Sequence, residues 1–441
     1  MLKKKKGYNI VTKSAKCKLL HDGFDLAETK LAFNEVVAFY FALVNTHPEG
    51  IDIPVVENGG WRYYELLTIG SEPQYPLFND GFPSQLRRAA IRKAIGAWKS
   101  WNSNYQQWLK RSKRHKHWRP PVQPRFFNFS PSFDSGVWKE DDGASIVLKI
   151  LVRGQWKYIK FHYQAPSIGG EWTKGSPSVV TKGNAAYIVF PLEKYNPATG
   201  GVKKIMDQDS FRVLGVDIDL DKHIAICSVL ESDAKGKVFE VVRHFINQTS
   251  HTKRRKRDLG TIADKMQQTG IIHQGFASSM WKRVHNREIE AGRAYARKIS
   301  ELALFWGCQV ISFEHLGNLI PIRGRYSRRS NQKRSYWLKS RVYQETSRVA
   351  FQEYNIISTR VSPKNTSRFD PWGNPVWRDN EFPTTLFDFQ HYQSGANFVG
   401  TVDGYIAHSG LNAARNIGLR AILRHRTNAE FQSGVKATTP N

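Results

Sequence analysis

The feature that most constrains the fold is an apolar segment that carries carboxylates. Residues 211–230 read FRVLGVDIDLDKHIAICSVL, which predicts two strands joined by a turn at Leu220–Lys222. Asp217 lies inside the first strand, where an unpaired carboxylate is costly. Because Asp219 and Asp221 follow at two-residue steps and share its face, an edge strand turned to water remains an alternative.

The order of the following elements predicts the fold of this half of the chain. We expect a third strand at 237–246, a long helix from Phe276, a buried strand at 308–316, a helix over Trp337–Tyr354, a strand at 355–363 and a final helix over Asn412–Leu423. Three antiparallel strands followed by helix–strand–helix–strand–helix is the order of an RNase H-like α/β fold.

A second carboxylate, Glu314, follows the apolar run VISF. Its alternative role is that of a strand-end residue facing solvent. RNase H-like nucleases hold two divalent metals between carboxylates and the scissile phosphate, and hard oxygen ligands suit Mg²⁺. Asp217 and Glu314 are therefore the candidate catalytic residues and the candidate Mg²⁺ ligands.

The first half of the chain predicts helices and then a small all-β unit. A strand segment at 8–20 precedes a helical run over Leu26–Val44, and Ser84 can N-cap a second helix. A proline-rich step at 119–126 ends that helix. Strand-like runs from there to about residue 194 predict an antiparallel barrel or sandwich, completed by a strand over 127–138.

The charge of the chain points to a polyanionic partner. There are 66 Lys and Arg against 38 Asp and Glu, a formal net charge of +28, for which nucleic acid is the default partner. Residues 84–119 include eleven Lys and Arg and no acid, whereas a solvated helix face usually mixes signs. The apolar face of this helix, with Trp98, Trp101, Tyr105 and Trp108, is expected to be core rather than a base-stacking platform.

Several classes of protein are not expected. The longest apolar run, Val36–Val44, is far shorter than the roughly 20 residues that cross a bilayer, so we expect no membrane partner. The segment MLKKKKGYNIV has no apolar region typical of a secretory signal. Cys17, Cys227 and Cys308 form no CxxC pair, which argues against a disulfide framework or a cysteine zinc site and fits a reducing cytosol.

Four segments, in order, resemble motifs of one family. VLGVDIDLDKHIAI around Asp217 and ISFEHLGNLI around Glu314 resemble its RuvC-like acidic motifs. VSPKNTSRF (361–369) resembles the segment ahead of its zinc ribbon, and HSGLNAARNI (408–417) resembles its last motif. On these segments the chain resembles the TnpB transposon nucleases and the type V CRISPR effectors, over nearly its whole length.

The resemblance implies a bilobed α+β multidomain protein with a helical recognition lobe, a β-barrel wedge domain and an RNase H-like (RuvC) α/β domain. The implied parts are a wedge strand at 1–25, a helical recognition domain at 26–122, a wedge barrel at 123–210, a RuvC-like domain at 211–368 and 405–426, a degenerate zinc-ribbon-like target-binding insert at 369–404, and a disordered tail at 427–441.

The zinc ribbon departs from the family pattern. Phe369, Trp372, Gly400 and Asp403 stand where the family has its four cysteine ligands. We therefore expect no zinc, and apolar packing of Phe369 and Trp372 is a candidate replacement for the metal.

The last acidic motif departs as well. The third catalytic aspartate of the family aligns with Gly410, which has no side chain. Each ligand of a two-metal site is worth orders of magnitude in rate, so cleavage is expected to be weak or absent. Asp219, Asp403 and His408 are the residues that could substitute for it.

The resemblance implies an RNA-guided DNA-binding protein, transposon-derived or from a CRISPR locus, with weak or no cleavage. Its partners would be a guide RNA and a double-stranded DNA target in a bacterial cytoplasm, close to the nucleoid. A second copy of the chain or an accessory protein is left open as a further partner. Two alternatives stay open, an active Mg²⁺-dependent RNA-guided DNA endonuclease and a protein that binds or processes guide RNA without a DNA target.

Two basic clusters supply candidate nucleic-acid contacts. One lies on the helix that starts at Ser84, and the other is the run KRRKR at 253–257. Such runs are usually solvated, but in this family context we predict phosphate contacts from both. The candidates are Arg87, Arg88, Arg92, Lys93, Lys110, Arg111, Lys113, Arg114, Lys253, Arg254, Arg255, Lys256 and Arg257.

Overall fold

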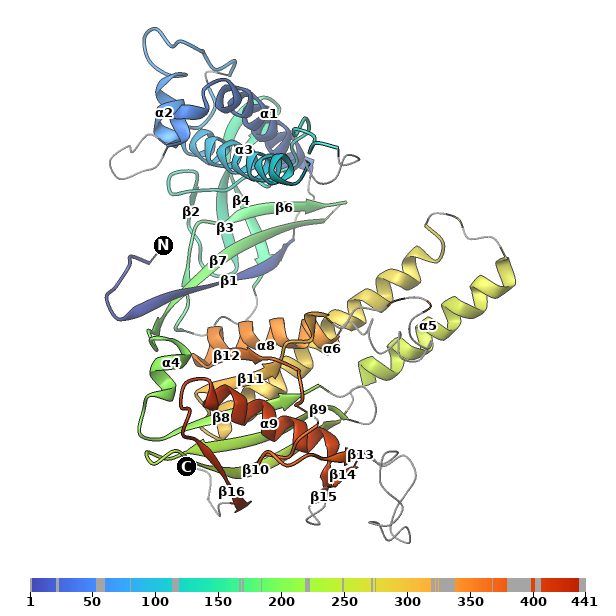
Figure 1. The fold of residues 1–441 in the computed structure, drawn as a ribbon. Coiled ribbons are helices and arrows are strands. Elements are labelled where there is room, and N and C mark those ends of the chain that lie inside the picture. The colour runs from blue at the N-terminus through green and yellow to red at the C-terminus, as the bar shows by residue number, and fades with distance from the viewer. Residues whose placement is uncertain are drawn as a thin grey trace. The chain divides into compact units, whose positions relative to one another are not determined.

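The chain folds into two units, Met1–Tyr195 and Asn196–Asn441, in the computed structural model (Figure 1). The structure describes residues 2–20, 24–52, 60–79, 81–112, 119–165, 168, 170–183, 185–218, 223–247, 250–270, 273, 275–318, 322, 324, 338–366, 368–378, 398–400 and 406–435. Among the helices in these ranges, none is long and apolar enough to cross a bilayer.

The first unit combines helices with one sheet. Its elements are β1 (Tyr8–Leu19), α1 (Phe24–Thr46), η1 (Pro48–Ile51), α2 (Trp61–Leu66), α3 (Ser84–Ser112), β2 (Trp138–Lys139), β3 (Ser145–Val152), β4 (Gln155–Gln164), β5 (Thr173–Lys174), β6 (Ser178–Lys182) and β7 (Ala185–Pro197). The sheet has the order β2-β3-β4-β1-β7-β5, with β6 beside β7. The N-terminal strand therefore joins the later strands, as the sequence predicts.

Helix α1 is apolar on most of its sides because it packs against both α3 and β3. Phe33, Val36 and Tyr40 of α1 are fully buried, as is Leu86 of α3.

The expected strand over 127–138 does not form, although a bridge joins Ser132 to Ser178 and β2 begins at Trp138. The side chain of Asn34 accepts from Phe129 N at 2.7 Å and donates to Phe129 O at 3.0 Å. Because one side-chain amide takes both backbone groups of Phe129, that residue cannot pair with a strand there.

The second unit is an α/β layer structure. Its elements are α4 (Gly201–Met206), β8 (Phe211–Asp217), β9 (His223–Ser232), β10 (Lys237–Asn247), α5 (Ser250–Thr269), α6 (Ser278–Phe305), β11 (Val310–Glu314), η2 (Leu316–Asn318), α8 (Leu338–Tyr354), β12 (Ile357–Val361), β13 (Trp377–Arg378), β14 (Phe398–Gly400), β15 (Ile406–His408), α9 (Ser409–Leu423) and β16 (Glu430–Val435).

The main sheet of the second unit has the order β12-β11-β8-β9-β10-β16. Strand β9 runs antiparallel to both β8 and β10, whereas β11 runs parallel to β8 and β12 runs parallel to β11. The succession of β8 to β12 along the chain and the antiparallel pairing of the first three strands are those that the sequence predicts. Strands β13, β14 and β15 form a separate small sheet.

Helices cover both faces of this sheet. Leu214 and Val216 of β8 pack in one cluster with Tyr295 of α6, and Val213 packs in another with Ile417 of α9. Side chains alternate along a strand, so Val213, Gly215 and Asp217 all face α9. A Cβ on Gly215 would lie only 2.1 Å from Ala414 O, which shows how closely α9 approaches β8.

Two segments differ from the sequence-based expectation. The basic run at 253–257 lies inside the 20-residue helix α5, which packs along α6, whereas a helix was expected only from Phe276. The expected disordered tail at 427–441 is wrong for residues 430–435, which form β16 parallel to β10. Phe431 is buried in the core there, and residues 436–441 lie outside the described ranges.

Candidate functional site

Asp217 and Glu314 end adjacent parallel strands. Val216 of β8 pairs with Phe313 of β11, and each is followed by its acidic residue. Ser312 Oγ donates to Ile417 O of α9 at 3.1 Å, which places Ser312, and by alternation Glu314, on the α9 face. The structure thus puts both predicted acids at one end of the sheet and on the same face.

Glu314 is held by the loop after β12. The Thr366 hydroxyl hydrogen-bonds Glu314 Oε1. Burial raises the pKa of Glu314 above its ordinary value, and the Thr366 hydrogen bond and the charge of Arg420 offset part of this effect. A divalent cation bound here would favour the ionised form further.

Gly410 lies next to Asp217, at the start of α9. A Cβ built on Gly410 would be 3.1 Å from Asp217 Oδ2 and 2.3 Å from Ile226 Cδ1. The backbone of Gly410 is outside the left-handed region, so its conformation does not require glycine. The position aligned with the third acid is therefore beside the first acid, and Ile226 fills the space that a side chain would need.

Two histidines lie close to this position. His408 is the N-cap of α9, and its Nδ1 accepts from Gly410 N at 3.2 Å. The ring centroids of His223 and His408 are 6.1 Å apart, and His223 Nδ1 lies 2.8 Å from Asn247 Oδ1. Because Nδ1 of His408 is the acceptor, its neutral ring carries the proton on Nε2 and presents a donor rather than a metal-binding lone pair.

The donor set that remains fits a metal only in part. Two carboxylates supply the hard oxygen ligands that Mg²⁺ prefers. Among the residues that the structure describes, no three His, Cys, Asp or Glu side chains group closely enough to hold a metal ion. Asp219 and Asp403, two of the proposed substitutes, lie outside the described residues.

The last two sequence motifs bind each other. Asn416 Nδ2 donates to Thr366 O at 2.8 Å and to Phe369 O at 2.7 Å, and Asn412 Nδ2 donates to Phe369 O at 2.9 Å. Both asparagines of α9 therefore hold the loop whose Thr366 contacts Glu314. These hydrogen bonds join the segment 365–369 to the first two turns of α9.

A buried ion pair fixes α9 to strand β10. Arg415 donates to Glu240 through Nε at 2.9 Å and through Nη2 at 2.5 Å, and Ser228 Oγ donates to Glu240 at 2.8 Å. The Glu240 side chain is 1% exposed. Burial alone would raise the pKa of Glu240, but Arg415 and Ser228 lower it below its ordinary value. Sequence reasoning missed this pair, because its members are 175 residues apart.

The former zinc-ribbon positions are held by hydrogen bonds. Asp370 is buried, and its Oδ1 accepts from Trp372 N at 3.0 Å and from Asn374 N at 2.8 Å. Trp372 is 43% exposed and packs edge-on against Phe431. Gly400 belongs to β14, and Asp403 lies outside the described residues.

Three of the predicted nucleic-acid contacts on α3 are in ion pairs. Arg87 and Arg88 both donate to Glu65, at 3.1 and 3.0 Å, and Arg92 pairs with Asp134. Such pairs occupy donors that a phosphate would otherwise use.

The other candidates on this helix are less engaged or not described. Lys93 is half-buried and Lys110 is exposed. The side chain of Arg111 is not described, and Lys113 and Arg114 lie outside the described residues. Nucleic-acid binding by this cluster stays a prediction.

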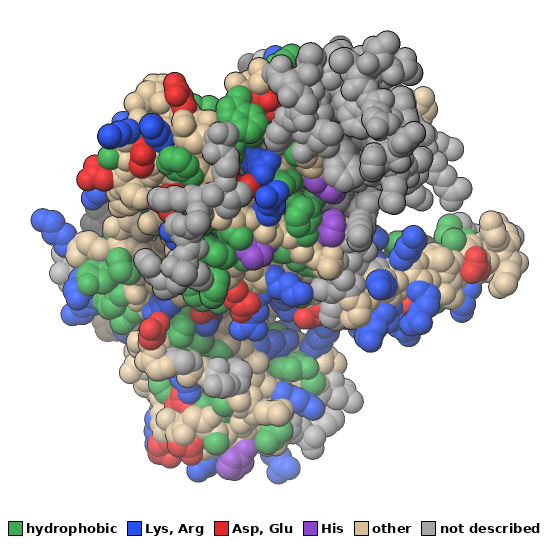
Figure 2. Space-filling model, turned by 90° about the horizontal axis from the view of Figure 1, so that it is seen from below, with side chains coloured by type: hydrophobic (Ala, Val, Ile, Leu, Met, Phe, Trp, Pro, Cys, Tyr) green, Lys and Arg blue, Asp and Glu red, His purple; other side chains and the backbone are tan. Residues whose placement is uncertain are grey.

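The second basic cluster lies on the arm formed by α5 and α6, where Figure 2 shows Lys and Arg side chains gathered. Lys253, Arg254, Lys256 and Arg257 are exposed. Arg255 instead donates to Glu288 of α6 at 2.7 Å. The helical period therefore turns four of the five residues outward and uses the fifth to hold the arm together.

Comparisons with known proteins agree with this architecture. Residues 13–152 match the model of the Aq_aa04 family. The solved structure of the mini-RNA-guided endonuclease CRISPR-Cas_phi3 is similar with a TM-score of 0.50 and 11% identity, over 94% of this chain and 92% of that one. A Cas12f1–sgRNA–target DNA complex gives a TM-score of 0.48 and 12% identity, over 93% and 99%. No curated protein matches the sequence.

At 11% identity the first of these likenesses is one of fold. It shows that the chain shares its fold with this RNA-guided endonuclease, in line with the resemblance that the motifs around Asp217 and Glu314 first indicated.

Proposed function

We propose that this chain is an RNA-guided DNA-binding protein of the type V effector kind whose RuvC-like site is deficient in cleavage. The observation that carries the proposal is the position of Gly410, 3.1 Å from Asp217 Oδ2 when a Cβ is added. The site thus has two carboxylates at neighbouring strand ends and glycine where the third is required for a two-metal reaction.

In this proposal base pairing with a guide RNA reads the DNA sequence, and the protein binds the backbone of the duplex. Asp217 and Glu314 would hold Mg²⁺, which in a complete site activates water and stabilises charge on the leaving oxygen. In this chain their remaining role is to bind a cation at the backbone of the target.

The direct test uses the purified protein with the RNA that co-purifies. That RNA is sequenced, and binding and cutting of a matching duplex and a scrambled duplex are measured with and without Mg²⁺. We expect guide-dependent binding of the matching duplex and background cutting. Guide-directed cutting that Asp217→Ala abolishes would establish the active endonuclease instead. Guide binding with no preference for the matching duplex would establish an RNA-binding or RNA-processing protein.

The α5 arm offers a test of backbone binding. Replacing Lys253, Arg254, Lys256 and Arg257 by Gln should weaken binding of all sequences alike and make the slope of log affinity against log salt shallower, by roughly 0.9 for each phosphate that the arm no longer neutralises. Arg255 is left in place because it pairs with Glu288. An unchanged slope would remove this arm from the nucleic-acid surface.

A further inference from the structure

The C-terminal half of α3 carries a ladder of aromatic rings, formed by Trp98, Trp101, Tyr105 and Trp108. Trp101 stacks on Tyr105 with ring centroids 5.4 Å apart, Tyr105 stacks on Trp108 at 5.6 Å, and Trp98 meets Trp101 edge-on at 6.4 Å. All four rings are half-buried, whereas Leu86 nearer the start of the same helix is fully buried. The expectation that these rings are core is therefore wrong for Trp101, Tyr105 and Trp108, whereas Trp98 packs against the edge of the core.

Hydrogen bonds fix the orientation of two of these rings. Trp101 Nε1 donates to Pro121 O at 3.1 Å, and Trp98 Nε1 donates to Asn45 Oδ1 at 3.4 Å. Gln123 Nε2 donates to the same Asn45 oxygen at 2.7 Å. The rings are thus held in place before any partner binds, which lowers the entropy lost on binding.

The surroundings of the ladder are basic and apolar at once. Helix α3 has no acidic residue, and Lys99 and Lys110 are exposed before and after the three stacked rings. In the segment that follows, Val122 is 81% and Phe126 is 96% exposed. A second copy of this chain would bring the same acid-free helix against itself, which like charge disfavours. Single-stranded nucleic acid instead offers both phosphates and unpaired base faces.

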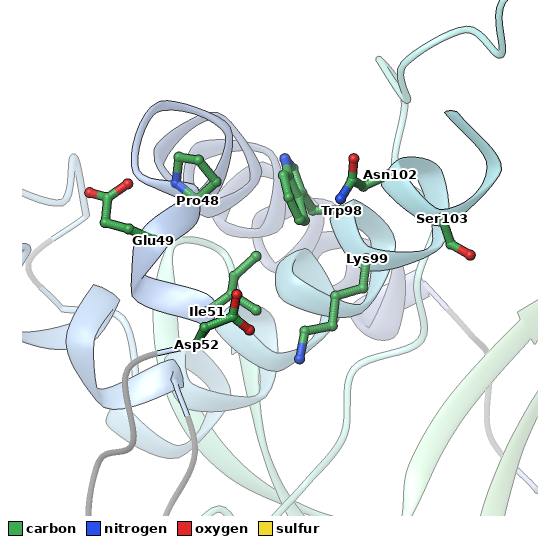
Figure 3. A pocket seen from close by; sticks show the side chains of 8 residues that line it. All are labelled: Pro48, Glu49, Ile51, Asp52, Trp98, Lys99, Asn102 and Ser103. Atoms are coloured by element: carbon green, nitrogen blue, oxygen red, sulfur yellow. The ribbon is translucent and has the colours of Figure 1, made fainter. Parts of the chain in front are cut away.

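A cavity of about 450 Å³ adjoins the ladder, and Trp98 is part of its wall (Figure 3). Helix α3 also contributes Lys99 and Asn102, and Glu49 and Asp52 belong to the region of η1 on the other side. The Glu49 side chain points away from Trp98 and Lys99 (Figure 3), and its Oε1 lies 3.1 Å from His47 Nδ1. The carboxylate of Asp52 repels phosphate but accepts from base amino groups and from a ribose 2′-OH, which DNA lacks. The cavity therefore suits the base and sugar of a ribonucleotide better than its phosphate.

We propose that the ladder and this cavity bind unpaired nucleotides of single-stranded RNA, with bases stacked on the rings and one nucleotide in the cavity. The inference deepens the proposed function, on which it rests for the source of the RNA. It is tested with free RNA strands, so a failure of this inference can be told apart from a failure of the proposed function.

The first experiment maps the contact in the unmodified protein. A 15-nucleotide oligouridylate containing 4-thiouridine is photocrosslinked to the protein, and tryptic peptides are analysed by mass spectrometry. Cleavage after Lys99 and Lys110 releases one peptide, 100–110, that contains the three stacked rings. We expect the crosslink in this peptide, and its absence there would overturn the proposal.

The second experiment separates stacking from charge. Trp101→Leu with Tyr105→Leu should weaken oligouridylate binding by about tenfold or more, with the salt slope unchanged, because stacking is removed while the basic residues stay in place. Trp101→Phe with Tyr105→Phe should restore binding. Leu31→Ala, a change at a 64% exposed residue of α1, is the control. An unchanged affinity in the Leu variant, or a change equally large for a 15-base-pair RNA duplex, contradicts the proposal.

The third experiment tests the choice of RNA over DNA and over a second copy. Oligouridylate should bind several-fold more tightly than oligodeoxyuridylate, and Asp52→Ala should remove that preference. Equal binding by the unmodified protein would overturn the assignment to RNA. A Leu variant that turns a dimer into a monomer while RNA binding is unchanged would show an interface between copies. Guide-dependent duplex binding is measured on the same proteins. If the unmodified protein shows none, the proposed function fails, whatever the oligouridylate results.

Discussion

The buried face of helix α9 and its first turn differ in the polar contacts that their residues make. Along its buried face, Arg415 and Asn416 bind groups on the sheet and on the loop after β12. In its first turn, Gly410 lies beside Asp217 and offers no ligand. Arg415 and Asn416 each make two or more hydrogen bonds, whereas Gly410 supplies no side chain beside Asp217.

Under the proposed function, this difference means that the fold around the site does not depend on the reaction. The contacts of Arg415 and Asn416 contribute to the stability of the second unit whether or not a metal binds. A third carboxylate contributes only when metal and substrate are present, so its loss leaves the packing intact.

The largest effect is expected from breaking the buried pair. Glu240→Gln leaves the Arg415 guanidinium buried without an opposite charge, so the free energy of unfolding should fall by about 3–5 kcal/mol in urea denaturation. The matched control is Glu290→Gln, because Glu290 pairs with Arg293 on the surface of α6 with both side chains more than half exposed. We expect less than about 0.5 kcal/mol there. Equal effects at the two positions would show that the buried pair does not anchor α9.

The same pair should make stability depend on pH. Since the folded-state pKa of Glu240 lies below its ordinary value of 4.5, its contribution is present above that value and is lost as pH falls through the folded-state pKa. The difference in melting temperature between the unmodified protein and Glu240→Gln should therefore shrink on going from pH 7 to below pH 4. A difference that stays constant over this range would contradict the assignment.

Replacing Asn416 or Asn412 should lower the free energy of unfolding by less than breaking the buried pair does, and by different amounts. Asn416→Ala removes the hydrogen bond to Thr366 O and one of two to Phe369 O, and should cost about 1–3 kcal/mol. Asn412→Ala should cost less, because Phe369 O keeps Asn416, and Asn412 Oδ1 is buried with no hydrogen bond within the described part of the chain. Urea denaturation of both variants measures the order, and the reverse order would refute this account.

A stability effect of similar size is expected at Gly410 itself. Gly410→Asp brings a Cβ against Ile226 Cδ1 and a charge beside Asp217, so we expect it to cost about 1–3 kcal/mol without metal. Ile226→Val removes the Cδ1 atom and should recover part of that loss. The melting temperatures of the single and double variants measure this, and a double variant no more stable than Gly410→Asp would place the clash elsewhere.

Much of the second unit could be predicted from local patterns. Near-continuous apolar runs predict β8 and β11 as buried strands, and an acid after each run predicts that Asp217 and Glu314 lie at strand ends. Those positions follow from the sequence because each depends on the few residues around it. The catalytic and metal-binding roles of the two residues remain predictions.

Other features depend on contacts between distant residues and could not be predicted. The closeness of Ile226 to Gly410 arises only when α9 packs on β9. The basic run at 253–257 forms helix because α6 supplies Glu288 as a partner for Arg255. The rings from Trp98 to Trp108 have a helical period that a core helix would share, so the period alone does not separate buried from half-exposed rings.

The central claim is that Gly410 occupies the position of the missing carboxylate. Its most direct test is the rate of guide-directed, Mg²⁺-dependent DNA cutting by the unmodified protein, by Gly410→Asp with Ile226→Val, and by that variant with Asp217→Ala added. We predict background cutting by the first, at least about 100-fold faster cutting by the second, and background again for the third. Cutting by the unmodified protein as fast as by the second variant would contradict the claim.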